Sequence, residues 1–191
     1  SEILDRHSDV VVETVGQISK GLVGHPRYRH FEEIRGVDEF AKFLGGRDWK
    51  IGLSPLHDSP FNASKTDNKY RLYAAASIAG IYSDIEPYRD SVEDGKTGLL
   101  ADAKAESWIR RIERLIGSSE LRSKIVENSK LDIRKRYDSR EVSMQYYNFL
   151  SKILEAPTIL AVSADGRYKA DGLVNLSANG TIKLKTIDSR S

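Results

Sequence analysis

The stretch 51–85 constrains the fold of this chain more than any other part of it. A short apolar run begins at Ile51, and a polar loop that contains Pro60 follows it. Residues 67–77 then show the spacing of a helix, and a second apolar run covers 78–82. Strand, loop, helix and strand make a βαβ unit, which crosses over right-handed into a parallel sheet. We therefore predict an α/β fold in which helices flank a parallel sheet.

Two lysines bracket the start of the predicted helix. Lys65 and Lys69 lie four residues apart, and the helix start adds unpaired N–H groups and the positive end of the helix dipole. Open α/β sheets bind ligands outside the carboxyl ends of their strands, where this loop is expected. The two ammonium groups are therefore candidates to hold a diphosphate. The alternative is that both lysines are solvated surface residues, as most lysines are.

This stretch resembles the C-terminal domain of the retaining, GT-B-fold glycosyltransferases of the glycosyl transferases group 1 family. Residues that match the family pattern in order include Ser54-Pro55-Leu56, Asp58, Phe61-Asn62, Lys65, Asp67, Lys69-Tyr70, Tyr73-Ala74-Ala75, Ser83-Asp84, Pro87-Tyr88-Arg89-Asp90 and Gly98-Leu99-Leu100. The resemblance covers residues 8–150 and implies a Rossmann-like sheet, one half of a GT-B fold. It also implies binding of a nucleotide-diphosphate sugar and transfer of the hexosyl group to a glycan or other acceptor in polysaccharide biosynthesis.

The resemblance also implies roles for particular residues. Lys65 and Lys69 become the catalytic candidates, because positive charge stabilises the diphosphate as it leaves the sugar. Gly36 and Val37 become contacts of the nucleotide base, and the alternative is an ordinary strand-to-helix turn. Three further residues are implied to line the donor pocket: Asn62, Glu86 and Tyr88.

Some positions depart from the family pattern. Leu72 and Ser64 stand where the family has acidic residues, and leucine cannot accept a hydrogen bond from a ribose hydroxyl. Ser77 and Ala79 replace the usual glycine and proline. Three functions therefore remain open: a donor-binding domain, a non-catalytic glycosyltransferase-like scaffold or interaction module, and a regulatory domain that binds another phosphorylated ligand.

The resemblance begins at the family's second strand, which we predict at residues 10–16. It implies that the first strand and the N-terminal Rossmann-like domain of the same protein lie upstream of Ser1. In this family the acceptor side of the cleft comes mostly from that N-terminal domain. We therefore expect the chain by itself to be inactive as a transferase.

Residues 1–155 are expected to form the Rossmann-like domain, and 156–191 a small β-rich appendage or the start of a further domain. In the first part we predict strands at 28–34 and 96–100, a helix capped by Asp38, and helices in 105–137 and 139–154. The last helix should turn five apolar residues inward: Val142, Tyr146, Phe149, Leu150 and Ile153. After Pro157 we expect β-like runs at 158–162, 173–176 and 181–187, with a hairpin turn at Asn179-Gly180.

The composition excludes several classes of function. The formal charge is only +2, which argues against a nucleic-acid partner, and no cysteine is available for disulfides or thiolate metal sites. No apolar window approaches the length of a transmembrane segment. Neither Asp-x-Asp nor G-x-G-x-x-G occurs, so we expect no metal and no cofactor apart from the nucleotide-sugar substrate. We expect a cytoplasmic protein or one peripheral to the membrane.

Overall fold

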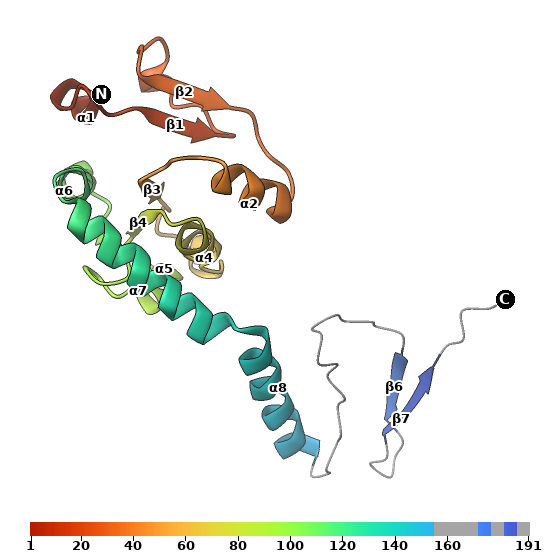
Figure 1. Ribbon diagram of the computed structural model, residues 1–191. Coiled ribbons are helices and arrows are strands. Elements are labelled where there is room, and N and C mark those ends of the chain that lie inside the picture. The colour runs from red at the N-terminus through yellow and green to blue at the C-terminus, as the bar shows by residue number, and fades with distance from the viewer. Residues whose placement is uncertain (155–171, 177–181, 187–191) are drawn as a thin grey trace. The chain divides into compact units, whose positions relative to one another are not determined.

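The computed structural model describes residues 1–154, 172–176 and 182–186 (Figure 1). The chain divides into two compact units, Ser1–Arg134 and Lys135–Ser191. The first unit holds five strands: β1 (Val12–Val15), β2 (Tyr28–Phe31), β3 (Ile51–Ser54), β4 (Ala79–Ser83) and β5 (Leu99–Ala101). Its helical elements are α1 (Glu2–Arg6), the 3-10 turn η1 (Lys20–Leu22), α2 (Val37–Gly45), α3 (Pro60–Ala63), α4 (Asn68–Ala75), α5 (Tyr88–Ser91), α6 (Ala105–Ile116) and most of α7 (Ser119–Tyr137).

All strand pairs of the first unit are parallel, and helices flank the strands, so the predicted α/β fold is confirmed. The predicted βαβ unit is formed by β3, α4 and β4, with Ile51 opposite Ala79. The strands form two sheets, however, with the orders β1-β2 and β3-β4-β5. The prediction had one parallel sheet. In the structure, no ladder hydrogen bonds join β1 or β2 to the other three strands.

Alternating side chains of β4 point to two different apolar clusters. Ala79 and Ile81 join a cluster with Leu99, Leu115 and Ile125, which packs α6 and α7 on one face of the sheet. Tyr82 joins the other cluster, which contains buried aromatic residues from α4 and α5. Helices on both faces explain why β4 is buried along its whole length, as parallel strands usually are.

Glycines make room for the rings of the second cluster. A Cβ atom on Gly52 would lie 2.6 Å from Cε2 of Tyr73, and one on Gly80 would lie 1.9 Å from the hydroxyl of Tyr82. Both distances are far shorter than a van der Waals contact. The missing side chains of β3 and β4 are therefore a condition for packing large tyrosine rings against this face of the sheet.

Several element boundaries differ from the prediction. Helix α4 ends at Ala75, and Ser77 is exposed with φ 62°, so it does not share the buried face of Tyr70 and Tyr73. Helix α2 is preceded by Gly36 rather than capped by Asp38, which lies in its first turn. The polar loop around Pro60 contains a short helix, α3, because the Ser59 hydroxyl accepts a hydrogen bond from the Asn62 N–H group.

In the second unit, α8 (Ser139–Leu154) confirms the last predicted helix. Its predicted inward face is wrong for Tyr146, Phe149 and Leu150, which are 66%, 60% and 41% exposed. Periodicity shows which residues share a helix face, but burial requires another element to pack on that face.

Strands β6 (Gly172–Leu176) and β7 (Ile182–Thr186) pair antiparallel in the second unit, with Leu176 opposite Ile182. This register differs by one residue from that of a two-residue turn at Asn179-Gly180, which would place Leu176 opposite Lys183. The turn itself and the predicted run 158–162 lie outside the described residues, and the predicted boundary at Pro157 stays a prediction.

Candidate functional site

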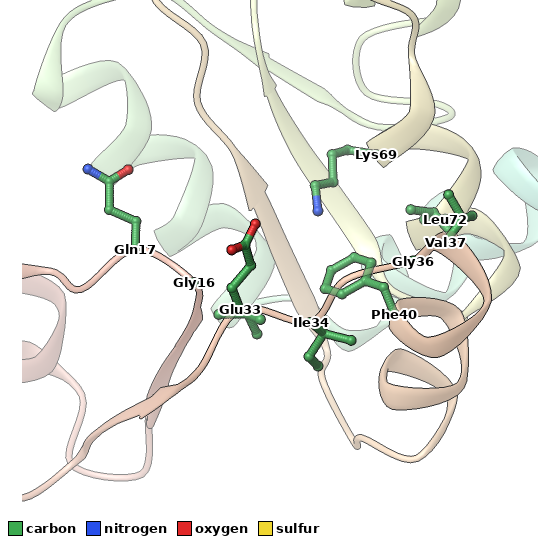
Figure 2. Close-up of a pocket in the computed structure, with 10 residues that line it drawn as sticks. Gly16, Gln17, Glu33, Ile34, Gly36, Val37, Phe40, Lys69 and Leu72 are labelled. Atoms are coloured by element: carbon green, nitrogen blue, oxygen red, sulfur yellow. The ribbon is translucent and has the colours of Figure 1, made fainter.

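An open pocket of about 690 Å³ lies at the carboxyl ends of β1 and β2 (Figure 2). Residues 15–17 line it where β1 ends, and Glu33 and Ile34 line it after β2. The start of α2 contributes Gly36, Val37 and Phe40, and α4 contributes Lys69 and Leu72. The pocket therefore occupies the edge at which open parallel sheets bind their ligands.

Two glycines shape the backbone of the pocket. Gly16 turns the chain at the end of β1 with φ 79°, and its N–H group still donates to the carbonyl of Phe31, at 2.9 Å. Gly36 has φ 96° at the entry to α2, and a Cβ there would lie 2.2 Å from a carboxylate oxygen of Glu39. Both backbone conformations are ones that L-residues rarely adopt, so the two turns depend on glycine.

Lys69 carries the positive charge of the pocket. Its ammonium nitrogen lies 4.0 Å from the centroid of the Phe40 ring, and the side chain is half-buried. Burial lowers the pKa of Lys69 below its usual value of 10.5. None of the ion pairs found among the described residues involves Lys69. A cation that is partly removed from water and has no carboxylate partner favours an anionic ligand.

The other polar side chains of the pocket are Gln17 and Glu33. Glu33 pairs loosely with Arg35, at 3.8 Å, and both of these side chains are largely exposed. The rest of the wall is apolar or glycine, including Ile34, Phe40 and Leu72. The lining therefore offers one cation and one carboxylate on an otherwise apolar surface.

The helix dipole of α4 contributes less to anion binding than the sequence suggests. Asp67 occupies the N-cap position of this helix, is 6% exposed and pairs with Arg71 at 3.0 Å. Its carboxylate already offsets the positive end of the dipole. The attraction of the pocket for a phosphate therefore depends mainly on Lys69.

The pocket brings together three of the seven residues that the sequence nominated: Gly36, Val37 and Lys69. Lys65 is not among the lining residues; it is exposed, and its ammonium nitrogen lies 4.8 Å from the centroid of the Phe61 ring. As predicted, Lys65 precedes α4, which begins at Asn68, so it does not share a helical face with Lys69.

The remaining three nominated residues also lie outside the lining. Asn62 is in α3, where its amide donates to the carbonyl of His57 at 2.7 Å and closes the loop. Tyr88 is 2% exposed, and its hydroxyl is 2.7 Å from the hydroxyl of Ser54 in the core. Glu86 is exposed, in the segment between β4 and α5. Their roles toward a donor sugar stay predictions.

Sequence reasoning did not single out Gln17, Glu33 or Phe40. Phe40 lies in α2, where it stacks on Phe43 with ring centroids 6.5 Å apart. Ligands bind at the carboxyl ends of parallel strands. Applying this rule to β1 and β2 as well as to β3 would have drawn attention to this part of the chain.

Among the described residues no group of three or more His, Asp or Glu side chains is arranged to hold a metal ion. The helices of the same residues include none whose length and hydropathy would let it cross a bilayer.

Solved glycosyltransferase structures resemble this chain at low sequence identity. The C-terminal domain of LpcC, a glycosyl transferase group 1 family protein from Francisella tularensis, aligns with a TM-score of 0.55 and 17% identity, over 70% of this chain and 73% of that domain. HepE from Anabaena, solved in complex with UDP-glucose, aligns with a TM-score of 0.54 and 13% identity, over 67% of this chain and 33% of that protein. A glycosyltransferase from Rickettsia africae aligns with a TM-score of 0.60 and 14% identity, over 78% of this chain and 41% of that protein.

No protein-family model matches the sequence, and no curated protein sequence matches it significantly. The likeness to solved structures therefore shows the fold. The chain spans about three quarters of the LpcC domain but less than half of the HepE and Rickettsia proteins. Its α/β architecture is that of the glycosyltransferase domains to which it is similar.

Proposed function

We propose that the first unit binds a nucleotide-diphosphate sugar as the donor half of a retaining glycosyltransferase. The observation that carries this proposal is the pocket that joins Gly36 and Val37, the candidate base contacts, to the half-buried Lys69. A base against the apolar start of α2 and a diphosphate at Lys69 would use both ends of this pocket. HepE, which has a similar fold, was solved with UDP-glucose bound, and this supports the proposal.

The chemistry assigned to Lys69 is stabilisation of the leaving group. When the bond between the sugar and the diphosphate breaks, negative charge grows on the diphosphate oxygen. An ammonium group already held at that point lowers the barrier, and it does so most strongly where water is partly excluded. Lys65 is the second candidate for this role. It would contribute if the segment before α4 moved toward the pocket on binding.

The transferase reaction itself needs more than this unit. Within the described residues, β1 pairs only with β2, and β3 pairs only with β4. One edge of β1 and one edge of β3 are therefore unpaired. Such edges accept a further parallel strand. We propose that residues upstream supply this strand and a second Rossmann-like domain with the acceptor site, and that the isolated chain binds the donor without transferring it.

Calorimetry with UDP tests the proposal. The wild-type chain should bind UDP, and Lys69→Ala should weaken binding roughly 10- to 100-fold, as expected for the loss of a charge-assisted contact. Lys65→Ala tests the second candidate, and it should weaken binding only if the segment before α4 moves into the pocket. Lys42→Ala is the control, since it removes the same charge from an exposed residue of α2 outside the pocket lining. A folded wild-type chain that does not bind UDP at millimolar concentration would refute the proposal.

A non-catalytic, glycosyltransferase-like scaffold is the second candidate function. Leu72 favours it, because this side chain lines the pocket where the family resemblance implies a carboxylate for the ribose. A chain that unfolds cooperatively but binds no nucleotide would support the scaffold. A site for another phosphorylated ligand, the third possibility, predicts that UDP competes poorly with that ligand.

A further inference from the structure

Lys69 is the lysine of the pocket lining, and its surroundings differ from those of the lysines that pair on the surface. Lys50, Lys96 and Lys124 each form an ion pair with an exposed carboxylate. Lys69 is half-buried, and none of the ion pairs found among the described residues involves it. Within the described part of the chain, therefore, no ion pair stabilises its charged form.

These surroundings favour the uncharged amine, which is the form of lysine that reacts as a nucleophile. Only that form has a lone pair with which to attack an electrophile, and a lysine that is partly removed from water forms it more readily. Burial lowers the pKa of Lys69 accordingly. The Phe40 ring, 4.0 Å from the nitrogen, attracts the ammonium form and reduces this effect. At a given pH a larger fraction of the Lys69 amine is therefore uncharged than in an exposed lysine.

The pocket also has room for an acyl group on this nitrogen. Its volume is about 690 Å³, so a small acyl donor can reach the amine. Val37, Phe40 and Leu72 give the same pocket an apolar wall, and Figure 2 shows the Lys69 nitrogen directed into the pocket that they line. An acetyl group on Lys69 would find an apolar surface there, and the amide that it forms carries no charge.

We propose that Lys69 is a site of acylation by thioesters, and that this modification switches off the anion site of the pocket. The uncharged amine attacks the carbonyl carbon of the thioester, and the bond between carbon and sulfur breaks. The proton that leaves the nitrogen goes to the thiolate, so the products are an amide and a thiol.

The effect of the modification on binding follows from charge. Acylation of a lysine removes its positive charge, and Lys69 is the cation to which the diphosphate is assigned. The switch therefore rests on the proposed function and adds to it a means of regulation. The site of modification itself does not depend on the identity of the ligand.

Peptide mass spectrometry after treatment with S-acetyl-N-acetylcysteamine, an uncharged thioester, tests the site of modification. At pH 8 Lys69 should be acetylated about three- to tenfold faster than Lys65, because its amine is more often uncharged. Lys65 is the internal control, since it is exposed and lies four residues away. In guanidinium chloride that unfolds the chain, the two lysines should react at nearly the same rate.

A carboxylate placed beside Lys69 should remove its advantage. Leu72→Glu puts an acidic side chain three residues along α4, where it can pair with the ammonium group and favour the charged form. Circular dichroism checks that this variant folds, and if it does not, the comparison in guanidinium chloride decides. Two results would overturn the site: equal rates for Lys69 and Lys65 in the folded chain, or an advantage of Lys69 that persists after unfolding.

The same acetylation assay with saturating UDP tests the switch. UDP should slow the acetylation of Lys69 and leave that of Lys65 unchanged. If calorimetry shows that UDP binds but the rate at Lys69 is the same with and without it, the switch is refuted. If the wild-type chain does not bind UDP, the proposed function fails and the switch fails with it. The rates of Lys69 and Lys65 without UDP still decide the site of modification.

Discussion

The Lys69 ammonium nitrogen lies 4.0 Å from the centroid of the Phe40 ring, so a residue of α4 is held over the first turns of α2. The two helices are separated along the chain by β3 and α3, and this contact fixes the charge of the pocket in place. A cation held over an aromatic face gains about 0.5–1 kcal/mol at exposed sites and more where water is excluded. The position of the charge is therefore prepared before a ligand arrives.

Replacing Phe40 by leucine should weaken UDP binding about two- to fivefold, because Lys69 loses the ring that positions it. Calorimetry measures the change. Phe43→Leu is the control, since Phe43 stacks on Phe40 but does not line the pocket. That variant should lose stability and keep its affinity within about twofold of wild type. Equal affinity of Phe40→Leu and wild type would show that the ring does not position the charge.

The affinity for a nucleoside diphosphate should depend on pH through Lys69. Burial lowers the pKa of the free amine below 10.5, and a bound anion favours the charged form and raises the pKa again. The affinity is therefore highest below the lowered pKa of Lys69 and falls as the pH rises through that value. With an exposed lysine the same fall would occur at a higher pH. Lys69→Arg stays charged throughout, so the fall should disappear in that variant.

Calorimetry with ADP between pH 8 and pH 10 measures this profile, because the last ionisation of a phosphate group lies near about pH 6 and the charge of the ligand is then nearly constant. The result that counts against the prediction is a fall in affinity of the same size and midpoint in wild type and Lys69→Arg. Some other group would then titrate in the site.

A second pH dependence concerns stability and involves the contact between the α1 end of the chain and α6. The Glu113 carboxylate is 2.6 Å from Nε2 of His7 and accepts a longer hydrogen bond from Arg6, at 3.3 Å. The hydrogen bond with His7, followed by that with Arg6, lowers the pKa of Glu113. A lowered carboxyl pKa stabilises the folded state above the usual value near 4.5, and the contribution is lost as the pH falls through the lowered pKa.

Glu113→Gln should therefore unfold at lower urea concentration than wild type at pH 7, and the difference should shrink at acid pH. Urea titrations at pH 7 and pH 3 measure it. Glu127→Gln on α7 is the control, because Glu127 is exposed and has no ion pair among those found in the described residues. A midpoint difference for Glu113→Gln that is unchanged between the two pH values would contradict the assignment.

Stretch 51–85 was predictable because its signals are local. Apolar runs of strand length and the spacing of Tyr70, Tyr73 and Ala74 define β3, α4 and β4 without knowledge of the rest of the chain. The exposed face of α8 was not predictable in this way. Its apolar periodicity is real, but Phe149 and Tyr146 are buried only if another element covers them, and the pattern within one helix does not supply that element.

The site shows the same limit. Lys69 was nominated from a local signal, a charge near a helix start, and Gly36 was nominated by the family resemblance. Glu33 and Phe40 have no such signal, since their place in the pocket depends on how the segment after β2 lies against α4. Lys65 precedes α4, as predicted, but its ammonium group lies near the Phe61 ring outside the pocket lining, and the sequence does not determine this side-chain position.

The tyrosine packing on the sheet gives a test of the fold itself. Alanine at Gly52 would place its Cβ 2.6 Å from Cε2 of Tyr73, a buried ring whose hydroxyl donates to the Leu53 carbonyl at 3.0 Å. Either the ring or β3 must shift, so Gly52→Ala should lower the free energy of unfolding by about 1–3 kcal/mol. Urea denaturation measures the loss.

Gly45→Ala is the matched control for this substitution. Gly45 ends α2 with open space around its Cβ position, so alanine there should raise stability by about 0.4–1 kcal/mol. The clash also predicts non-additivity: in a Tyr73→Ala background the ring is gone, and Gly52→Ala should then cost almost nothing. If Gly52→Ala is as harmless in the wild-type chain as Gly45→Ala, the ring does not occupy the space that glycine leaves, and the packing of β3 against α4 described above is wrong.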